Sequence, residues 1–223
     1  GCTITNLTSL GFSAMMHGYM AFDKEGTLLV PFRTWRNTIT GEASEELTAL
    51  FHYHIPQRFS IAHLYQAMLK KEPHLTKIDS LLTLAGYINW QMTGEKVIGI
   101  GEASGMFPID IQTKDYNQNM INQFEEKAAS MGYNFHLREL LPKTALAGEI
   151  AGYLTEEGAR KLDVSGSLKA GVPIAPAEGD AGTGMTATNS VAVRTGNVSA
   201  GTSVVGMVIL EQDLKEVHDE IDL

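Results

Sequence analysis

The sequence predicts an α/β protein with a mixed sheet flanked by helices. Near the start, residues 7–14 alternate apolar and polar side chains, as a half-buried strand does. Through the middle of the chain, segments with helical spacing begin or end at capping residues. After about residue 165 the chain becomes rich in glycine and poor in charge, which predicts strands joined by tight turns. Strands and helices that alternate in this way are typical of the α/β class.

Five segments are predicted to be helices because their apolar residues recur at helical spacing. They cover residues 44–53, 60–71, 77–92, 115–131 and 155–162. Gly94 and Gly132 stand where C-caps are expected, and Thr155, followed by two glutamates, is a typical N-cap. A hairpin is predicted over residues 21–30, with its turn at residues 23–26.

The glycine-rich part predicts a second domain. Residues 172–176 form an extended run, and residues 195–205 read as strand, turn and strand. We expect residues 1–172 to form the first domain and residues 173–223 the start of the second. The segment after Ser190 would lack partner strands, so we expect it either to be disordered or to pair in a homodimer.

The composition excludes several classes of function. The chain has 223 residues, with 17 Lys and Arg against 26 Asp and Glu, and a formal net charge of −9. This balance argues against a protein that binds nucleic acid or an anionic membrane surface. Its apolar stretches fall short of the roughly 20 residues that span a bilayer. Cys2 is the single cysteine, so an internal disulfide is excluded and a reducing, cytoplasmic location is expected.

The turn at Gly201, Thr202 and Ser203 has two interpretations. Its backbone N–H groups could approach a phosphate, because Gly201 has no Cβ and the two hydroxyls add donors. It could equally be a plain hairpin turn that requires a glycine. It is neither a Walker loop nor a dinucleotide fingerprint, because the residues that those motifs need are missing.

Asp180 also has two interpretations. A carboxylate at the end of a strand, in a glycine-rich bend, can accept a proton from a substrate hydroxyl. It can also cap a helix over residues 182–190, and the two roles are compatible.

Two further positions could contact a ligand. His17 at the end of the first strand could hydrogen-bond a hydroxyl, or its ring could simply be satisfied by the backbone. Trp35 beside Asn37 offers an aromatic face and an amide for a sugar, although a tryptophan is equally at home in a core. The pair His52 and His54 does not share a helix face, so no metal site is expected.

Seven segments, in order, resemble the FGGY family of carbohydrate kinases. They are residues 13–18, 35–39, 84–95, 102–105, 154–159, 179–180 and 199–203. The first resembles the Ser-Gly-Gln-Met-His-Gly turn of xylulokinases, and the sixth falls where the family carries Gly-Gly-Gly-Asp. The resemblance implies an actin-like, ribonuclease-H-like ATPase fold in two domains.

The resemblance also implies roles for single residues. Asp180 aligns with the general base, which takes the proton from the sugar hydroxyl that attacks ATP. Met16, His17, Trp35 and Asn37 align with the sugar side. The turn at residues 201–203 aligns with a loop that holds ATP phosphates, and Mg²⁺ is the expected cation. The expected partners are therefore a small-molecule sugar and ATP.

The chain departs from the family pattern in ways that affect substrate and activity. It starts after the family's Asp-x-Gly-Thr hairpin and lacks the adenosine motif, so we expect a fragment that does not turn over alone. Met15, Asn37, Ile39 and Ala181 replace polar or charged family residues. A ketopentose, a deoxy-ketose or a polyol therefore all stay open as substrates. The alternative is a sugar or nucleotide sensor on the same fold.

Overall fold

The computed structural model describes residues 7–200, 204–212, 214–218 and 220–222. The helices are α1 (Gly41–Phe51), α2 (Ser60–Leu69), α3 (Leu84–Thr93), α4 (Ile100–Ser104), α5 (Gln118–Ser130), α6 (Leu137–Leu140), α7 (Glu156–Leu162) and α8 (Asp180–Ala187), with a 3-10 turn at Pro73–Thr76. The strands are β1 (Ser13–Ala14), β2 (Met20–Phe22), β3 (Ser80–Leu82), β4 (Val97–Gly99), β5 (Ile109–Asp110), β6 (Asp115–Tyr116), β7 (Lys143–Ala145), β8 (Gly152–Tyr153), β9 (Pro173–Ile174), β10 (Glu178–Gly179), β11 (Gly196–Ala200) and β12 (Val204–Val208).

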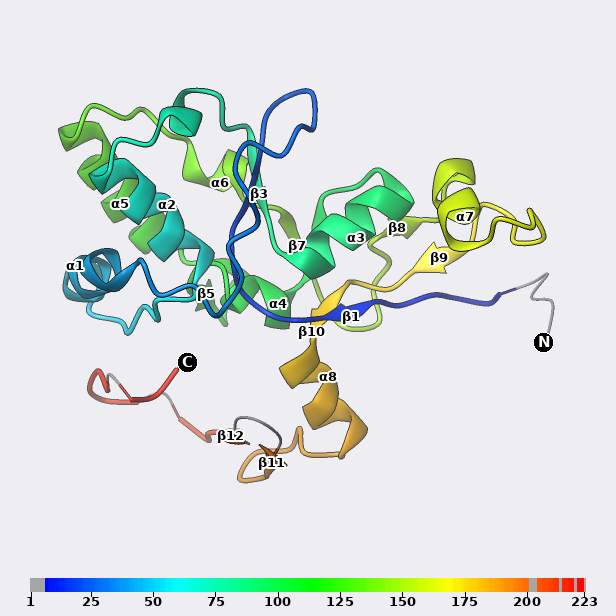
Figure 1. The fold of residues 1–223 in the computed structure, drawn as a ribbon. Coiled ribbons are helices and arrows are strands. Elements are labelled where there is room, and N and C mark those ends of the chain that lie inside the picture. The colour runs from blue at the N-terminus through cyan, green and yellow to red at the C-terminus, as the bar shows by residue number, and fades with distance from the viewer. Residues whose placement is uncertain (1–6, 201–203, 213, 219, 223) are drawn as a thin grey trace.

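The strands form pairs of both orientations. β1 pairs with β10 and β4 pairs with β7 in parallel, whereas β2–β3, β5–β6, β8–β9 and β11–β12 are antiparallel. A parallel pair needs a long connection between its strands, and β1 and β10 are joined by most of the chain. This pairing brings the end of β1 beside the start of α8 (Figure 1).

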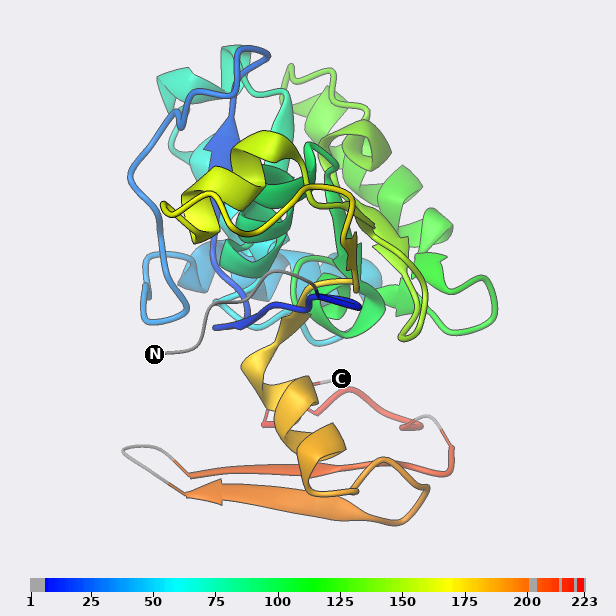
Figure 2. The ribbon, with the colours of Figure 1, turned by 90° about the vertical axis from the view of Figure 1, so that its right-hand side faces the viewer.

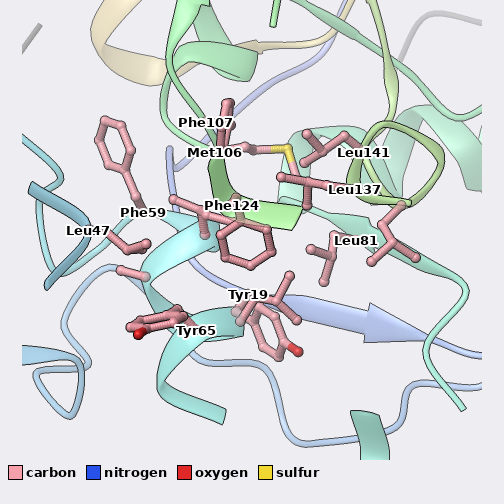
Figure 3. Close-up of a cluster of buried hydrophobic side chains, with 14 of the residues drawn as sticks. Tyr19, Leu47, Phe59, Tyr65, Leu81, Met106, Phe107, Phe124, Leu137 and Leu141 are labelled. Atoms are coloured by element: carbon pink, nitrogen blue, oxygen red, sulfur yellow. The ribbon is translucent and has the colours of Figure 1, made fainter. Parts of the chain in front are cut away.

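The main hydrophobic core lies among α1, α2, α5 and the strand β3. Aromatic side chains fill much of it, among them Tyr19, Phe107 and Phe124, each fully buried (Figure 3). Burying a side chain of this size stabilises the fold by roughly 1.5–3 kcal/mol. A smaller cluster around Leu154 and Ile174 packs α3 and α7 against β9.

Most of the helices predicted from the sequence are present, with shifted ends. α2 and α7 begin at or next to the expected residue, and the Thr155 hydroxyl caps α7 by accepting from the Gly158 N–H at 3.0 Å. α1 begins three residues earlier than expected, at Gly41. α5 begins at Gln118, because Asn117 caps it and Asp115 belongs to strand β6.

The predicted helix over residues 77–92 is wrong in its first half. Ser80–Leu82 forms strand β3, which pairs with β2, and α3 begins only at Leu84, capped by Thr83. All three residues of β3 are buried. A strand buried on both faces has the continuous apolar character of a buried helix segment, so the apolar pattern could not separate the two.

The predicted turn at residues 23–26 is confirmed. The Gly26 N–H donates to the Asp23 carbonyl at 3.0 Å, and Gly26 has a φ of 80°, which favours glycine. The returning segment pairs with β2 only at the isolated bridge between Phe22 and Leu28, and β2 pairs over its whole length with β3.

Beyond α8 the chain leaves the main body. The two strands predicted within residues 195–205 are confirmed: β11 and β12 pair antiparallel, with Ala200 opposite Val204, and the predicted turn between them lies outside the described residues. Figure 2 shows α8 leading from the body to this hairpin. The hairpin exposes Val198, Val204 and Val208. The domain boundary at residue 173 stays a prediction, and β9 and β10 pair with strands of the first part of the chain.

Candidate functional site

The candidate site lies where β1, α4 and β10 meet. β1 leads into Met16 and His17, and β10 leads into Asp180 at the start of α8. The parallel register places Ala14 opposite Gly179, so the residues that follow β1 and the residues that follow β10 leave the pair at the same end. Figure 1 shows β1, β10 and α4 together at the base of the main body, directly above α8.

Met16 packs against Gly179. A Cβ on Gly179 would overlap the Met16 Cγ and would lie 2.6 Å from the Met16 Sδ and from the Glu102 Oε2. The backbone of Gly179 is extended, with φ −70° and ψ 152°, so the glycine is needed here for space rather than for conformation.

His17 is held in a fixed orientation by α4 and by Phe59. Its Nδ1 lies 3.3 Å from the Gly105 carbonyl, and its ring stacks on Phe59 with the centroids 5.5 Å apart. Burial, with a smaller contribution from the charge of Arg58, lowers the pKa of His17 to about 4. The imidazole is therefore neutral at neutral pH, with Nδ1–H donating to Gly105 and Nε2 left as an acceptor.

Asp180 is exposed and belongs to the first turn of α8. Its Oδ1 accepts from the Ala181 N–H at 3.0 Å. The expected capping of a helix over residues 182–190 is wrong, because α8 begins at Asp180 itself and the N-cap position is Gly179. Packing against Met16 and Glu102 leaves no room for a capping side chain at that position.

Trp35 and Asn37 lie on a separate turn. Trp35 is 40% exposed and the Arg36 guanidinium stacks on its ring at 4.9 Å. Asn37 makes local hydrogen bonds, accepting from the Ile39 N–H and donating from its own N–H to Thr34. Within the described ranges these hydrogen bonds do not reach His17 or Asp180.

The structure thus brings together Met16, His17 and Asp180. Thr34, which precedes Trp35, lies against Gly18, which follows His17. Gly201, Thr202 and Ser203 lie outside the described residues. Among the residues that are described, no group of three or more His, Cys, Asp or Glu side chains is arranged to hold a metal ion. A surface hollow of about 640 Å³ lies elsewhere, between Lys24, Asp79 and Phe135, and contains none of the predicted site residues.

Two carboxyl groups of the site were not predicted as functional. Glu102 on α4 is fully buried, and burial raises its pKa to about 8, with the Thr83 hydroxyl opposing this shift and Glu178 and Asp180 adding to it. Glu178 on β10 accepts from the Glu102 N–H at 2.8 Å, and burial raises its pKa as well. The nearby glycines 99 and 101 were the available signal, since they open the space that Glu178 fills.

The fold and the site define an α/β protein with an exposed carboxylate where a parallel strand pair ends. Residues 1–186 match the N-terminal domain of the FGGY family of carbohydrate kinases. The chain belongs to this family.

Relatives of known activity are similar over much of the chain. The xylulose kinase of Escherichia coli K12 is 24% identical over 230 residues, which cover 98% of this chain and 44% of the relative. The L-fuculokinase of the same strain is 28% identical over 167 residues, which cover 71% of this chain and 32% of the relative. The chain therefore spans less than half the length of these relatives.

Solved structures share the fold. A ligand-bound xylulose kinase from Lactobacillus acidophilus has a TM-score of 0.76 at 17% identity, and 94% of this chain and 42% of that one are covered. This likeness confirms the predicted fold class. Within the described ranges, no helix has the length and apolar character needed to cross a bilayer. The cytoplasmic location and the homodimer stay predictions.

Proposed function

We propose that this chain belongs to an ATP-dependent kinase that phosphorylates a hydroxyl of a ketose or a polyol, with Asp180 as the general base. The observation that carries the proposal is the position of the Asp180 carboxylate. It is exposed to solvent at the end of β10, beside the turn that carries Met16 and His17. A small hydroxylated ligand bound at this turn would lie within reach of it.

The proposed chemistry needs little from the protein besides a base and fixed geometry. The substrate hydroxyl loses its proton to Asp180 as its oxygen forms a bond to the γ-phosphorus of ATP. The bond from that phosphorus to the bridging oxygen breaks, and ADP leaves. Positioning and electrostatic stabilisation supply most of the rate in phosphoryl transfer.

The sugar side would be formed by His17 and Met16. The neutral His17 can accept a hydrogen bond from a substrate hydroxyl at Nε2, because Nδ1 is already engaged with Gly105. Met16 supplies an adaptable apolar surface next to Gly179. Trp35 and Asn37 are proposed as outer contacts to the sugar, since Trp35 presents an exposed ring.

The ATP side would be formed by the turn at residues 201–203, between β11 and β12. The exposed Asp180 carboxylate is an oxygen ligand of the kind that Mg²⁺ takes, and the ion is proposed to arrive bound to the nucleotide. When bound, Mg²⁺ would offset phosphate charge. The acidic chain could then bind an anionic substrate.

The sugar is proposed only as a class. Asn37 and Ile39 stand where the family has an acid and an arginine, and Ala181 follows the proposed base. Each replacement removes a group that could bind a particular sugar hydroxyl. The loss of such a group strongly changes how well an enzyme discriminates between similar sugars.

A substitution of Asp180 separates the kinase from a sensor on the same fold. The Asp180→Asn variant of the whole gene product should lose sugar-dependent ADP formation by about a hundredfold or more while it keeps its affinity for ATP. Asp79→Asn, whose carboxylate pairs with Lys96 at the surface, is the matched control and should keep full activity. Unchanged activity in Asp180→Asn would refute the role of Asp180, and ligand binding without any turnover would favour the sensor.

A further inference from the structure

Glu102 and Glu178 connect α4 and β10 in opposite directions. Glu178 on β10 extends to the N-terminus of α4, where its Oε2 accepts from the Glu102 N–H at 2.8 Å. Glu102 on α4 points back toward β10, where its Oε2 would lie 2.6 Å from a Cβ on Gly179. Glu178 therefore joins the two elements by a hydrogen bond and Glu102 joins them by packing, and we call the two side chains together the double connection.

Glycines make room for both side chains. A Cβ on Gly99 would overlap the Glu178 carboxyl, and a Cβ on Gly101 would lie 2.8 Å from its Oε2. Gly179 does the same for Glu102. A side chain at any of these three positions would therefore displace one of the two carboxyl groups.

The charge state of Glu102 is set by its surroundings. Its side chain is fully buried, and neither carboxyl oxygen has a partner with full hydrogen-bond geometry in the part of the chain that the structure describes. The groups that face it are the Thr83 hydroxyl and the carboxyls of Glu178 and Asp180, and its own charge would act on the Tyr116 phenol. Ionisation of Glu102 would place a charge in a buried position beside two other carboxyl groups, which is unfavourable in free energy. Glu102 is therefore a neutral acid up to a pH of about 8.

The double connection acts on both halves of the candidate site. α4 is followed directly by its C-cap residue Gly105, whose carbonyl accepts from the His17 ring. β10 ends at Gly179, which contacts Met16 and leads directly into Asp180. Fixing α4 to β10 therefore fixes His17 relative to Asp180.

We propose that Glu102 and Glu178 are positioning residues, which hold α4 against β10 and so set the geometry between the His17 ring and the Asp180 carboxylate. The proposal rests on the proposed kinase function only for its kinetic consequences. Its structural consequence, a rigid connection at Gly179 and Asp180, holds for any function of the site.

The structural test is amide hydrogen exchange at Gly99 and Glu178, whose N–H groups donate to the Ala177 and Phe12 carbonyls. The variants are Glu102→Ala and Glu178→Gln, with Glu95→Gln, an exposed glutamate, as the matched control. Both site variants should exchange at least about tenfold faster at these amides than the control, because local opening becomes easier. Exchange equal to that of the control would overturn the proposal, whatever the activity of the protein.

The kinetic test uses the whole gene product with its sugar and Mg·ATP. Glu102→Gln keeps a neutral side chain of the same shape, so kcat at pH 7 should stay within about threefold of the parent, whereas Glu102→Ala should lose about ten- to a hundredfold in kcat. The activity of the parent should fall as the pH rises through about 8, and Glu102→Gln should remove this fall. A pH profile shared by the parent and Glu102→Gln, or a full kcat in Glu102→Ala, would overturn the proposal. Absence of turnover in the parent would instead contradict the proposed function and leave the exchange test decisive.

Discussion

A methyl group added at Gly179 tests the packing of the candidate site. The Cβ of Gly179→Ala would lie 2.6 Å from the Glu102 Oε2 and 2.6 Å from the Met16 Sδ. The same Cβ would also overlap the Met16 Cγ. Carbon atoms in contact normally stand roughly 3.5–4.0 Å apart, so more than about 1 Å of overlap must be relieved. Overpacking of this kind costs about 1–3 kcal/mol. The backbone at Gly179 is acceptable to alanine, so the whole cost comes from the side chains.

The assay is urea unfolding followed by circular dichroism, with Gly182→Ala as the matched control. A Cβ at Gly182 meets no atom within 4 Å, and the residue lies inside α8. That variant should therefore gain roughly 0.5–1 kcal/mol through the lower entropy of its unfolded state. Adding Met16→Ala to Gly179→Ala should recover part of the loss. The reasoning is refuted if Gly179→Ala is as stable as Gly182→Ala.

Three further substitutions or titrations test separate parts of the fold. Thr155→Ala removes the hydroxyl that caps α7 at the Gly158 N–H, and urea unfolding should show a loss of about 1–2 kcal/mol. Burial lowers the pKa of His17 and of His63 to about 4 each, below the 6.5 of an unfolded chain. The free energy of unfolding should therefore decrease as the pH falls from 6.5 toward 4, because the unfolded chain takes up protons that these two rings do not. NMR titration should find both rings neutral at pH 6. Burial raises the pKa of Glu102 from 4.5 to about 8, so its contribution to stability falls as the pH rises between these values. Glu102→Gln should be more stable than the parent at pH 8 by roughly 3–5 kcal/mol and nearly equal to it at pH 4.5; equal stability at both pH values would contradict the burial argument.

Local signals in the sequence predicted local structure well. The capping of α7 by Thr155 and the turn that ends at Gly26 depend on a few adjacent residues, and both are as expected. The first half of the predicted helix over residues 77–92 failed because β3 is buried on both faces, so the identity of its partner strand decides its structure. That partner, β2, lies far away in the sequence.

The sequence predicted the part of the candidate site that depends on local signals and missed the part that depends on distant contacts. Asp180 and His17 carry recognisable chemistry in glycine-rich or strand-end positions, so the sequence pointed to both. Glu102 and Glu178 are separated by 76 positions, and their connection depends on space left by glycines on another element. A pattern along the chain does not contain that information. The start of α8 was misplaced for a related cause, since tertiary packing at Gly179 excludes a capping side chain.

The central claim is tested most directly by ADP release from the whole gene product. Mg·ATP is supplied with a panel of ketoses and polyols, and an Asp180→Ala variant is measured beside it. The account predicts release that one sugar stimulates and that the variant loses. A folded protein that binds ATP but releases no ADP with any sugar of the panel, or an Asp180→Ala variant as active as the parent, would contradict it.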